Sequence, residues 1–161
     1  KELLILPRRE EESAVRGEHA LLTGYLLELA MFASVCCENP NIKDLLVSAY
    51  THPMSLKIIR ESDTKRAMQV FGKYCPDWRE KDFIQTENVV SGMEYAMFMT
   101  ENTEGLTFGQ SVFGSIDAIM KVYEIPKEIR DSIIAEITTL DYISMGNHVF
   151  DEFCNKKTRK M

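Results

Sequence analysis

The segment from Ala20 to Cys37 constrains the fold most strongly, because its side chains are apolar on nearly every face of a helix. A helix that is apolar all round must be surrounded by protein or by lipid. Glu28 lies in the middle of this segment, and Thr23, Gly24 and Ser34 interrupt it. These residues favour a buried core helix over a membrane span. We therefore expect one central helix around which the rest of the chain is arranged.

The remaining sequence also has helical periodicity, without alternating β-branched runs bounded by turns. Turns that contain Pro40, Pro53 and Pro76 separate the apolar stripes, because proline cannot continue a helix. The predicted class is all-α, an antiparallel bundle of about six to seven helices in a single domain over residues 1–161. The expected helices are Glu10–Glu38, Asn41–Tyr50, Met54–Glu61, one capped by Ser62 or Asp63 and reaching Tyr74, Trp78–Thr100 capped by Asp77, Leu106–Glu124, and a last helix from Pro126 that carries Phe153.

Composition excludes several classes of protein. The chain has 161 residues, of which 45% are hydrophobic, so one domain can bury a core without metal or disulfides. A formal net charge of −6 has the wrong sign for a free-standing nucleic-acid binder, and the basic tail at 156–160 is typical of a solvated end. The four cysteines have no CxxC spacing and no signal peptide is recognisable, which indicates a reduced, cytoplasmic chain.

The stretch CCENPNIKDLLVSAYTHP, residues 36–53, combines cysteines, a histidine and carboxylates. Cys36 and Cys37 would project about 100° apart on a helix, and a proline turn separates them from His52. We interpret the stretch as a helix junction and expect no metal and no cofactor. Phosphate-binding loops are absent, and nothing fixes Cys154 and His148 as a catalytic pair. The chain is therefore predicted not to be an enzyme, and no catalytic residue is assigned.

Glu28 and Glu94 stand in mostly apolar helical segments. A buried carboxylate is costly unless it is paired. Each glutamate therefore has two readings: an internal partner of a tyrosine or arginine, or a ligand-binding group that selects cationic or hydrogen-bonding molecules. Nine methionines and many aromatic residues would suit an adaptable interior around such a ligand.

Three stretches carry a resemblance to a known family. They are YLLELAMFASVCCENPNIKDLLVSAY (25–50), THPMSLKIIRESDTKRAMQVF (51–71) and FGQSVFGSIDAIMKVYEIPKEIRDSIIAEITTLDYISMGNHVFDEF (108–153). This pattern resembles the C-terminal regulatory domain of TetR/AcrR-family bacterial transcriptional repressors. The resemblance implies a small-molecule effector bound in the helical core, a homodimer and DNA binding through an N-terminal helix-turn-helix. We expect that module upstream of this sequence.

The resemblance and the helical positions together give two sets of candidate residues. The last two long helices are expected to form a dimeric four-helix bundle, with small residues at Gly109, Ser111, Gly114 and Ser115 allowing close approach. Its expected interface residues are Val112, Ile116, Ile119, Ile137, Leu140 and Phe150. The expected effector-binding residues are Tyr25, Glu28, Phe32, Phe71, Trp78, Met93, Glu94 and Met97.

The functional expectation has two forms. In the first, the chain is the effector-sensing and dimerisation domain of a TetR-like transcriptional repressor and binds a small, largely apolar molecule that controls DNA binding. In the alternative, it is a helical protein–protein interaction module with a fully packed core and no small-molecule ligand. A cavity of a few hundred Å³ that opens onto the central helix would favour the first.

Overall fold

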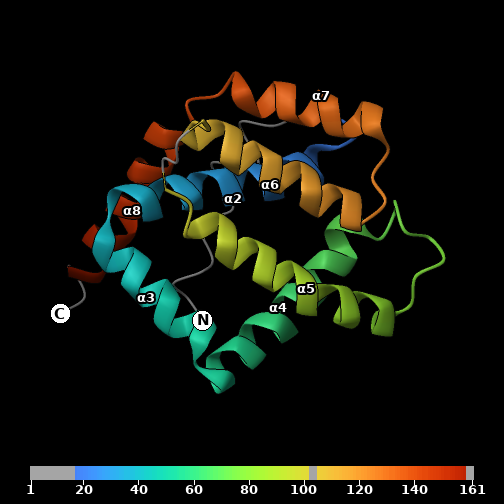
Figure 1. Cartoon of the computed structure of the whole chain (residues 1–161), viewed down its shortest axis with the longest axis horizontal. Helices are drawn as coiled ribbons and strands as arrows, with labels where there is room; N and C mark the ends of the chain where they lie inside the picture. Colours follow the sequence, from blue (N-terminus) through green and yellow to red (C-terminus); the bar gives the residue numbers. More distant parts are fainter. Residues whose placement is uncertain (1–16, 102–104, 159–161) are drawn as a thin grey trace.

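The computed structural model describes residues 17–101 and 105–158, which contain seven α-helices and no β-strand (Figure 1). The predicted all-α class and number of helices are confirmed. Residues 10–16 of the first expected helix lie outside the described part, and residues 17–19, which were expected to be helical, are not, because the helix begins at Ala20. The helices are α2 (Ala20–Glu38), α3 (Pro40–Thr51), α4 (Pro53–Phe71), α5 (Glu80–Phe98), α6 (Phe108–Val122), α7 (Lys127–Thr138) and α8 (Tyr142–Thr158).

Helix α2 is the centre of the bundle, as its apolar sequence predicts. It contacts each of the other six described helices, and its buried side chains lie on all of its faces. Leu22, Leu26, Leu27 and Met31 are almost completely buried, and each such side chain contributes about 1.5–3 kcal/mol of hydrophobic stabilisation. By length and composition α2 is also the one described helix apolar enough to cross a membrane, yet 72% of that stretch is buried inside the bundle.

The α2–α3 junction forms at the predicted turn. The side chain of Asn39 accepts hydrogen bonds from the backbone N–H groups of Asn41 (3.1 Å) and Ile42 (3.3 Å), and so caps α3. Just before it, Cys36 is buried in the core while Cys37 is exposed. The two thiols therefore lie in different surroundings, as expected for a helix junction. The described residues hold no group of three or more metal-ligating side chains.

Helix α4 corrects one prediction. The two helices expected over Met54–Glu61 and from Ser62 or Asp63 onward are a single helix, Pro53–Phe71. Proline at the first position starts this helix, and its interior contains neither glycine nor proline to interrupt the hydrogen-bond ladder. Asp63 does not cap a helix, because it lies within α4 and its charge interacts with groups in the interior of the protein.

The end of the chain corrects a second prediction. The expected last helix is two helices, α7 and α8, that are separated at Thr139–Asp141. The Thr139 hydroxyl donates to the carbonyl of Glu136 (2.6 Å), and Asp141 accepts from the backbone N–H of Ser144 (3.1 Å). Threonine and aspartate thus bind local backbone groups and terminate one helix and begin the next. As a result, α7 packs against α6 whereas α8 packs against α2 (Figure 1).

The contact between α8 and α2 yields a first prediction. A methyl group at Gly146 would lie 2.8 Å from the Met31 carbonyl oxygen and 3.2 Å from Ser34 Oγ. Gly146→Ala is therefore expected to lower the free energy of unfolding by about 1–3 kcal/mol in urea denaturation. Gly92→Ala is the matched control, because nothing lies within 4 Å of its added methyl; it should stabilise by about 0.5–1 kcal/mol. Equal effects of the two substitutions would contradict this account of the α2–α8 contact.

Candidate functional site

Four carboxyl groups gather in the interior where α2, α4 and α5 meet. We call Glu28, Asp63, Glu87 and Glu94 the acid cluster. Only 1% of Glu87 and 3% of Glu94 is exposed, and the charge of Asp63 acts on both. Burying so many acidic groups together disfavours folding unless each is neutral, hydrogen-bonded or paired. The partners of each carboxyl group therefore decide what this site can do.

Glu94 is held by two tyrosines. The hydroxyl of Tyr25 donates to Glu94 Oε1 (2.6 Å), and that of Tyr50 donates to Glu94 Oε2 at a longer distance, 3.4 Å. Burial raises the pKa of Glu94 to about 8, and the nearby Asp63 charge adds to this shift, while the hydrogen bond from Tyr25 opposes it. Glu94 is consequently mostly protonated near pH 7.

Glu87 has a partner on one oxygen only. The Tyr123 hydroxyl donates to Glu87 Oε1, whereas Glu87 Oε2 is buried and accepts no hydrogen bond from any described residue. Burial raises the pKa of Glu87 to about 7, against the effect of the Tyr123 hydrogen bond. A buried polar atom without a partner costs about 1–3 kcal/mol. A hydrogen-bond donor brought to Oε2 would therefore be favourable.

Arg66 supplies positive charge to the cluster. Its guanidinium forms a bidentate pair with Glu28, in which Nη1 donates to Oε1 (2.8 Å) and Nη2 donates to Oε2. The same guanidinium carbon lies 4.9 Å from the centre of the Tyr25 ring. Burial raises the pKa of Asp63 to about 6, although the charge of Arg66 acts in the opposite direction. Glu28 thus has a dedicated cation, unlike Glu87 and Glu94.

Aromatic rings enclose the acid cluster. Phe71 stacks on Tyr123, with ring centres 3.8 Å apart, and meets Tyr25 edge-on at 5.5 Å. Trp78 lies 5.8 Å from Tyr123 and 5.2 Å from Phe83. Phe71 therefore joins the tyrosine that holds Glu94 to the tyrosine that holds Glu87, and Trp78 extends the aromatic group toward the surface.

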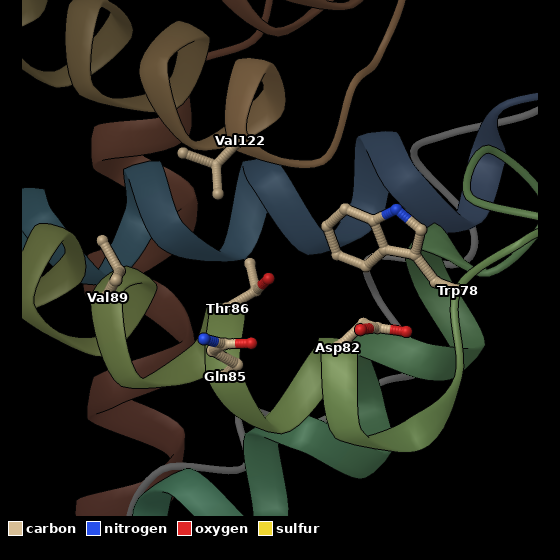
Figure 2. A pocket seen from close by; sticks show the side chains of 6 residues that line it. All are labelled: Trp78, Asp82, Gln85, Thr86, Val89 and Val122. Carbon is tan, nitrogen blue, oxygen red and sulfur yellow. The ribbon is translucent and has the colours of Figure 1, made fainter.

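An open cleft of about 500 Å³ lies beside Trp78, between α5 and the end of α6. Figure 2 shows the side chains of α5 along one side, with Val122 reaching in from α6 and the Trp78 ring at one end. Helix α5 begins at Glu80 and not at Trp78, as was predicted. The N–H of Arg79, just before the helix, donates to Asp82 Oδ2 (2.8 Å). Trp78 therefore lies in the loop that precedes α5. The cleft is lined by Trp78, Asp82, Gln85, Thr86, Val89 and Val122. None of these residues belongs to α2, so this cleft is not the expected cavity that opens onto the central helix.

The predicted effector-binding residues fall into two groups. Tyr25, Glu28, Phe71 and Glu94 lie together in or against the acid cluster, and Trp78 lines the cleft. The second group is Phe32, Met93 and Met97. Phe32 contacts Phe98 (5.0 Å) near the end of α5, Met97 is buried in the core, and Met93 is only partly buried.

Five residues of the site were not predicted from the sequence: Tyr50, Asp63, Arg66, Glu87 and Tyr123. The burial of Glu87 could have been predicted from the sequence, because Glu87 lies seven residues before Glu94 on the apolar stripe that also contains Phe83 and Val90. Residues seven apart return to the same face of a helix, so two carboxyl groups on this apolar stripe should have been expected. The other four join the site only through tertiary packing.

The structure also places the expected dimer-interface residues. Val112, Ile116, Ile119 and Ile137 have no exposed surface within a single chain. Leu140 and Phe150 are partly exposed. In this conformation, only the last two of the six residues lie where a second copy of the chain would reach them.

Comparisons with known proteins return no match: no family model, no curated protein and no solved structure is similar to this chain. Functional assignment therefore rests on the chemistry of the site and on the resemblance present in the sequence.

Proposed function

We propose that this chain is the effector-sensing and dimerisation domain of a TetR-like transcriptional repressor, a cytoplasmic bacterial protein. A small, largely apolar molecule binds at the aromatic end of the helical core. Binding changes the DNA affinity of a helix-turn-helix module outside this sequence. The observation that carries the proposal is the cleft of about 500 Å³ that adjoins the aromatic rings of the core.

The size and lining of the cleft support a small-molecule ligand. Binding sites for such ligands typically enclose about 300–1,000 Å³ and combine apolar walls with a few polar groups. Here Trp78, Val89 and Val122 offer apolar surface, whereas Asp82 and Gln85 are polar. This composition favours a ligand with an apolar body and a limited number of polar groups.

The position of the cleft supports a sensing role. A ligand in the cleft contacts Trp78, whose ring lies 5.8 Å from that of the buried Tyr123. Tyr123 in turn stacks on Phe71 of α4 and donates to Glu87 of α5. Both α4 and α5 contact the central helix α2. A ligand that binds one arrangement of these helices more tightly than another shifts the population toward the first arrangement. Such a shift is what couples the ligand site to a second site.

Dimerisation is the other part of the proposal. Small-molecule control in such a repressor acts on two DNA-binding modules, so the domain pairs with a second copy about a two-fold axis. The exposed apolar surface available for pairing includes Leu140, Ile143 and Phe150, at the start and along the length of α8. Light scattering behind a sizing column measures the mass of the protein in solution. We expect twice the mass of the chain. A monomer at tens of micromolar would contradict the proposed dimerisation.

The small-molecule function is tested with three compounds that share one apolar body: 4-phenylbutylamine, 4-phenylbutanol and 4-phenylbutyrate. Trp78 is the only tryptophan, so its fluorescence reports directly on the cleft. At least one compound is expected to change this fluorescence and raise the unfolding temperature at concentrations up to about 1 mM.

Two matched substitutions locate the binding. Val122→Phe fills part of the cleft and should weaken binding about tenfold or more, whereas Ile58→Phe adds the same ring to an exposed position on α4 and should leave binding unchanged. If none of the three compounds binds, the effector-sensing function is wrong, and the interaction module with a packed core and no ligand takes its place.

A further inference from the structure

The second oxygen of Glu87 is the least satisfied polar atom in the described interior. Glu87 is 1% exposed, and its Oε2 accepts no hydrogen bond from any described residue. Buried side-chain oxygens in folded proteins almost always have a partner. A glutamine at this position would accept the Tyr123 hydrogen bond equally well without bringing an acidic group into the core. The arrangement is therefore that of an acceptor whose donor comes from another molecule.

The surroundings of Glu87 determine the charge of that donor. Asp63 adds negative potential at Glu87, so an anionic ligand would be repelled. The tyrosine hydroxyls nearby already donate to Glu87 or Glu94, and the Arg66 guanidinium forms a bidentate pair with Glu28. A cationic donor would both satisfy Oε2 and balance the excess of acidic groups.

The aromatic rings next to Glu87 suit the same kind of ligand. Tyr123 and Phe71 are stacked, and the Trp78 ring lies 5.8 Å from that of Tyr123. The faces of aromatic rings attract ammonium ions, and tryptophan does so most strongly. These rings also offer the apolar contact that the body of an organic amine needs.

On the basis of the small-molecule function proposed above, we propose that the effector is an organic amine, whose primary ammonium group donates to Glu87 Oε2. Its apolar body lies against Trp78 and Tyr123. The amine approaches through the cleft, which Thr86 and Val122 line (Figure 2). Glu87 and Tyr123 are buried and do not line the cleft, so the ligand reaches them only when the Trp78 ring moves aside. Trp78 lies in the loop that precedes α5, so its ring is able to turn aside without breaking a helix.

The test is a calorimetric titration of 4-phenylbutylamine and 4-phenylbutanol into the wild-type protein, Glu87→Gln and Glu128→Gln. The amine should bind the wild-type protein about tenfold or more tightly than the alcohol, because a charged donor forms the stronger hydrogen bond with a carboxylate. Glu87→Gln should reduce that ratio to about one. Glu128→Gln makes the same change at an exposed carboxylate on α7, outside the cleft, and should leave the ratio unchanged.

A second comparison needs only the wild-type protein, so it stands even if Glu87→Gln does not fold. The N,N,N-trimethyl derivative of the amine keeps the positive charge but has no N–H group, and it should bind about tenfold more weakly than the primary amine. Equal binding of these two cations would overturn the hydrogen bond to Glu87 Oε2.

The outcomes separate this inference from the function on which it rests. Equal binding of amine and alcohol, a Glu87→Gln variant that keeps the preference, or a Glu128→Gln variant that loses it would each overturn the assignment of an amine to Glu87. In those cases the effector-sensing function still stands, because a compound has bound. If neither these compounds nor 4-phenylbutyrate binds, the function itself fails.

Discussion

Replacing Arg66 with methionine is expected to lower the free energy of unfolding by about 3–5 kcal/mol near pH 7. The guanidinium donates to both oxygens of Glu28, which is only 7% exposed. Methionine retains apolar contact with the Tyr25 ring but leaves the Glu28 carboxylate buried without its cation. Replacing a whole buried ion pair by apolar residues of similar size often changes the stability little. Removing only one partner is strongly destabilising, because the other charge stays buried without compensation. Urea denaturation of the variant measures the loss.

Two further variants make this prediction specific. The double substitution Glu28→Gln with Arg66→Met should recover most of the lost stability, because the Glu28 charge that Arg66 compensates is then removed as well. Lys57→Met removes the cation of an exposed pair with Glu61, whose side chains are 67% and 63% exposed. That change should cost less than about 1 kcal/mol. Equal losses for Lys57→Met and Arg66→Met would contradict the buried role assigned to the Arg66–Glu28 pair.

The second large effect is a loss of stability as the pH rises. Between about pH 5.5 and pH 8.5 the free energy of unfolding is expected to fall by about 3 kcal/mol or more. Burial raises the folded-state pKa of Glu87 from 4.5 to about 7, that of Glu94 from 4.5 to about 8, and that of Asp63 from 3.8 to about 6. Between the unfolded and folded values, the folded protein holds more protons than the unfolded chain, so stability decreases with rising pH.

The other titratable groups near these carboxyls do not reverse the fall in stability with rising pH. Burial raises the pKa values of Tyr25, Tyr50 and Tyr123, so the three hydroxyls remain protonated through this range. For Asp117, desolvation raises the pKa, but the hydrogen bonds and charges of Lys121 and Arg130 together lower it below its usual value. Its stabilising effect is therefore complete before this pH range begins. Arg66 stays charged throughout. The net slope is therefore set by the acid cluster.

Glu94→Gln tests that origin. Glutamine resembles the protonated carboxyl group and still accepts the Tyr25 hydrogen bond, but it does not ionise. The variant should match the wild-type protein near pH 5.5, exceed its stability near pH 8.5, and show a flatter pH dependence. Urea denaturation at both pH values measures this. A wild-type stability that rises across the window would contradict the burial of these carboxyls in the folded protein.

The sequence predicted the centre of this fold better than its ends. A segment that is apolar on all faces has to be enclosed, so α2 was correctly expected to be central. Serine and aspartate often begin helices, so Ser62 and Asp63 led to a predicted helix boundary inside α4. The boundary is absent because neither proline nor glycine interrupts the helix there. The Thr139–Asp141 turn carried hydroxyl and carboxylate groups that compete for the backbone, but without a proline or glycine it was read as continuous helix.

The site was predictable to the extent that it lies on α2 and α5. Glu28 and Glu94 stand out because they interrupt apolar stripes of single helices, and Tyr25 shares a face with Glu28. Arg66 and Tyr50 lie on α4 and α3, where the pattern of apolar and polar residues does not distinguish these two positions from their neighbours. Their roles depend on how α3 and α4 pack against α2 and α5, and local periodicity carries no information about that packing.

The most direct test of the central claim is the proton balance when 4-phenylbutylamine binds. Because Glu87 has a pKa of about 7, it is mostly protonated near pH 6 and has to lose its proton to accept an ammonium group as a carboxylate. Calorimetric titrations at about pH 6 in cacodylate and in bis-tris, whose ionisation enthalpies differ, count the protons exchanged. We predict the release of about one proton per amine bound, and none for Glu87→Gln. Binding with the same enthalpy in both buffers would show that no buried carboxyl group receives the ligand.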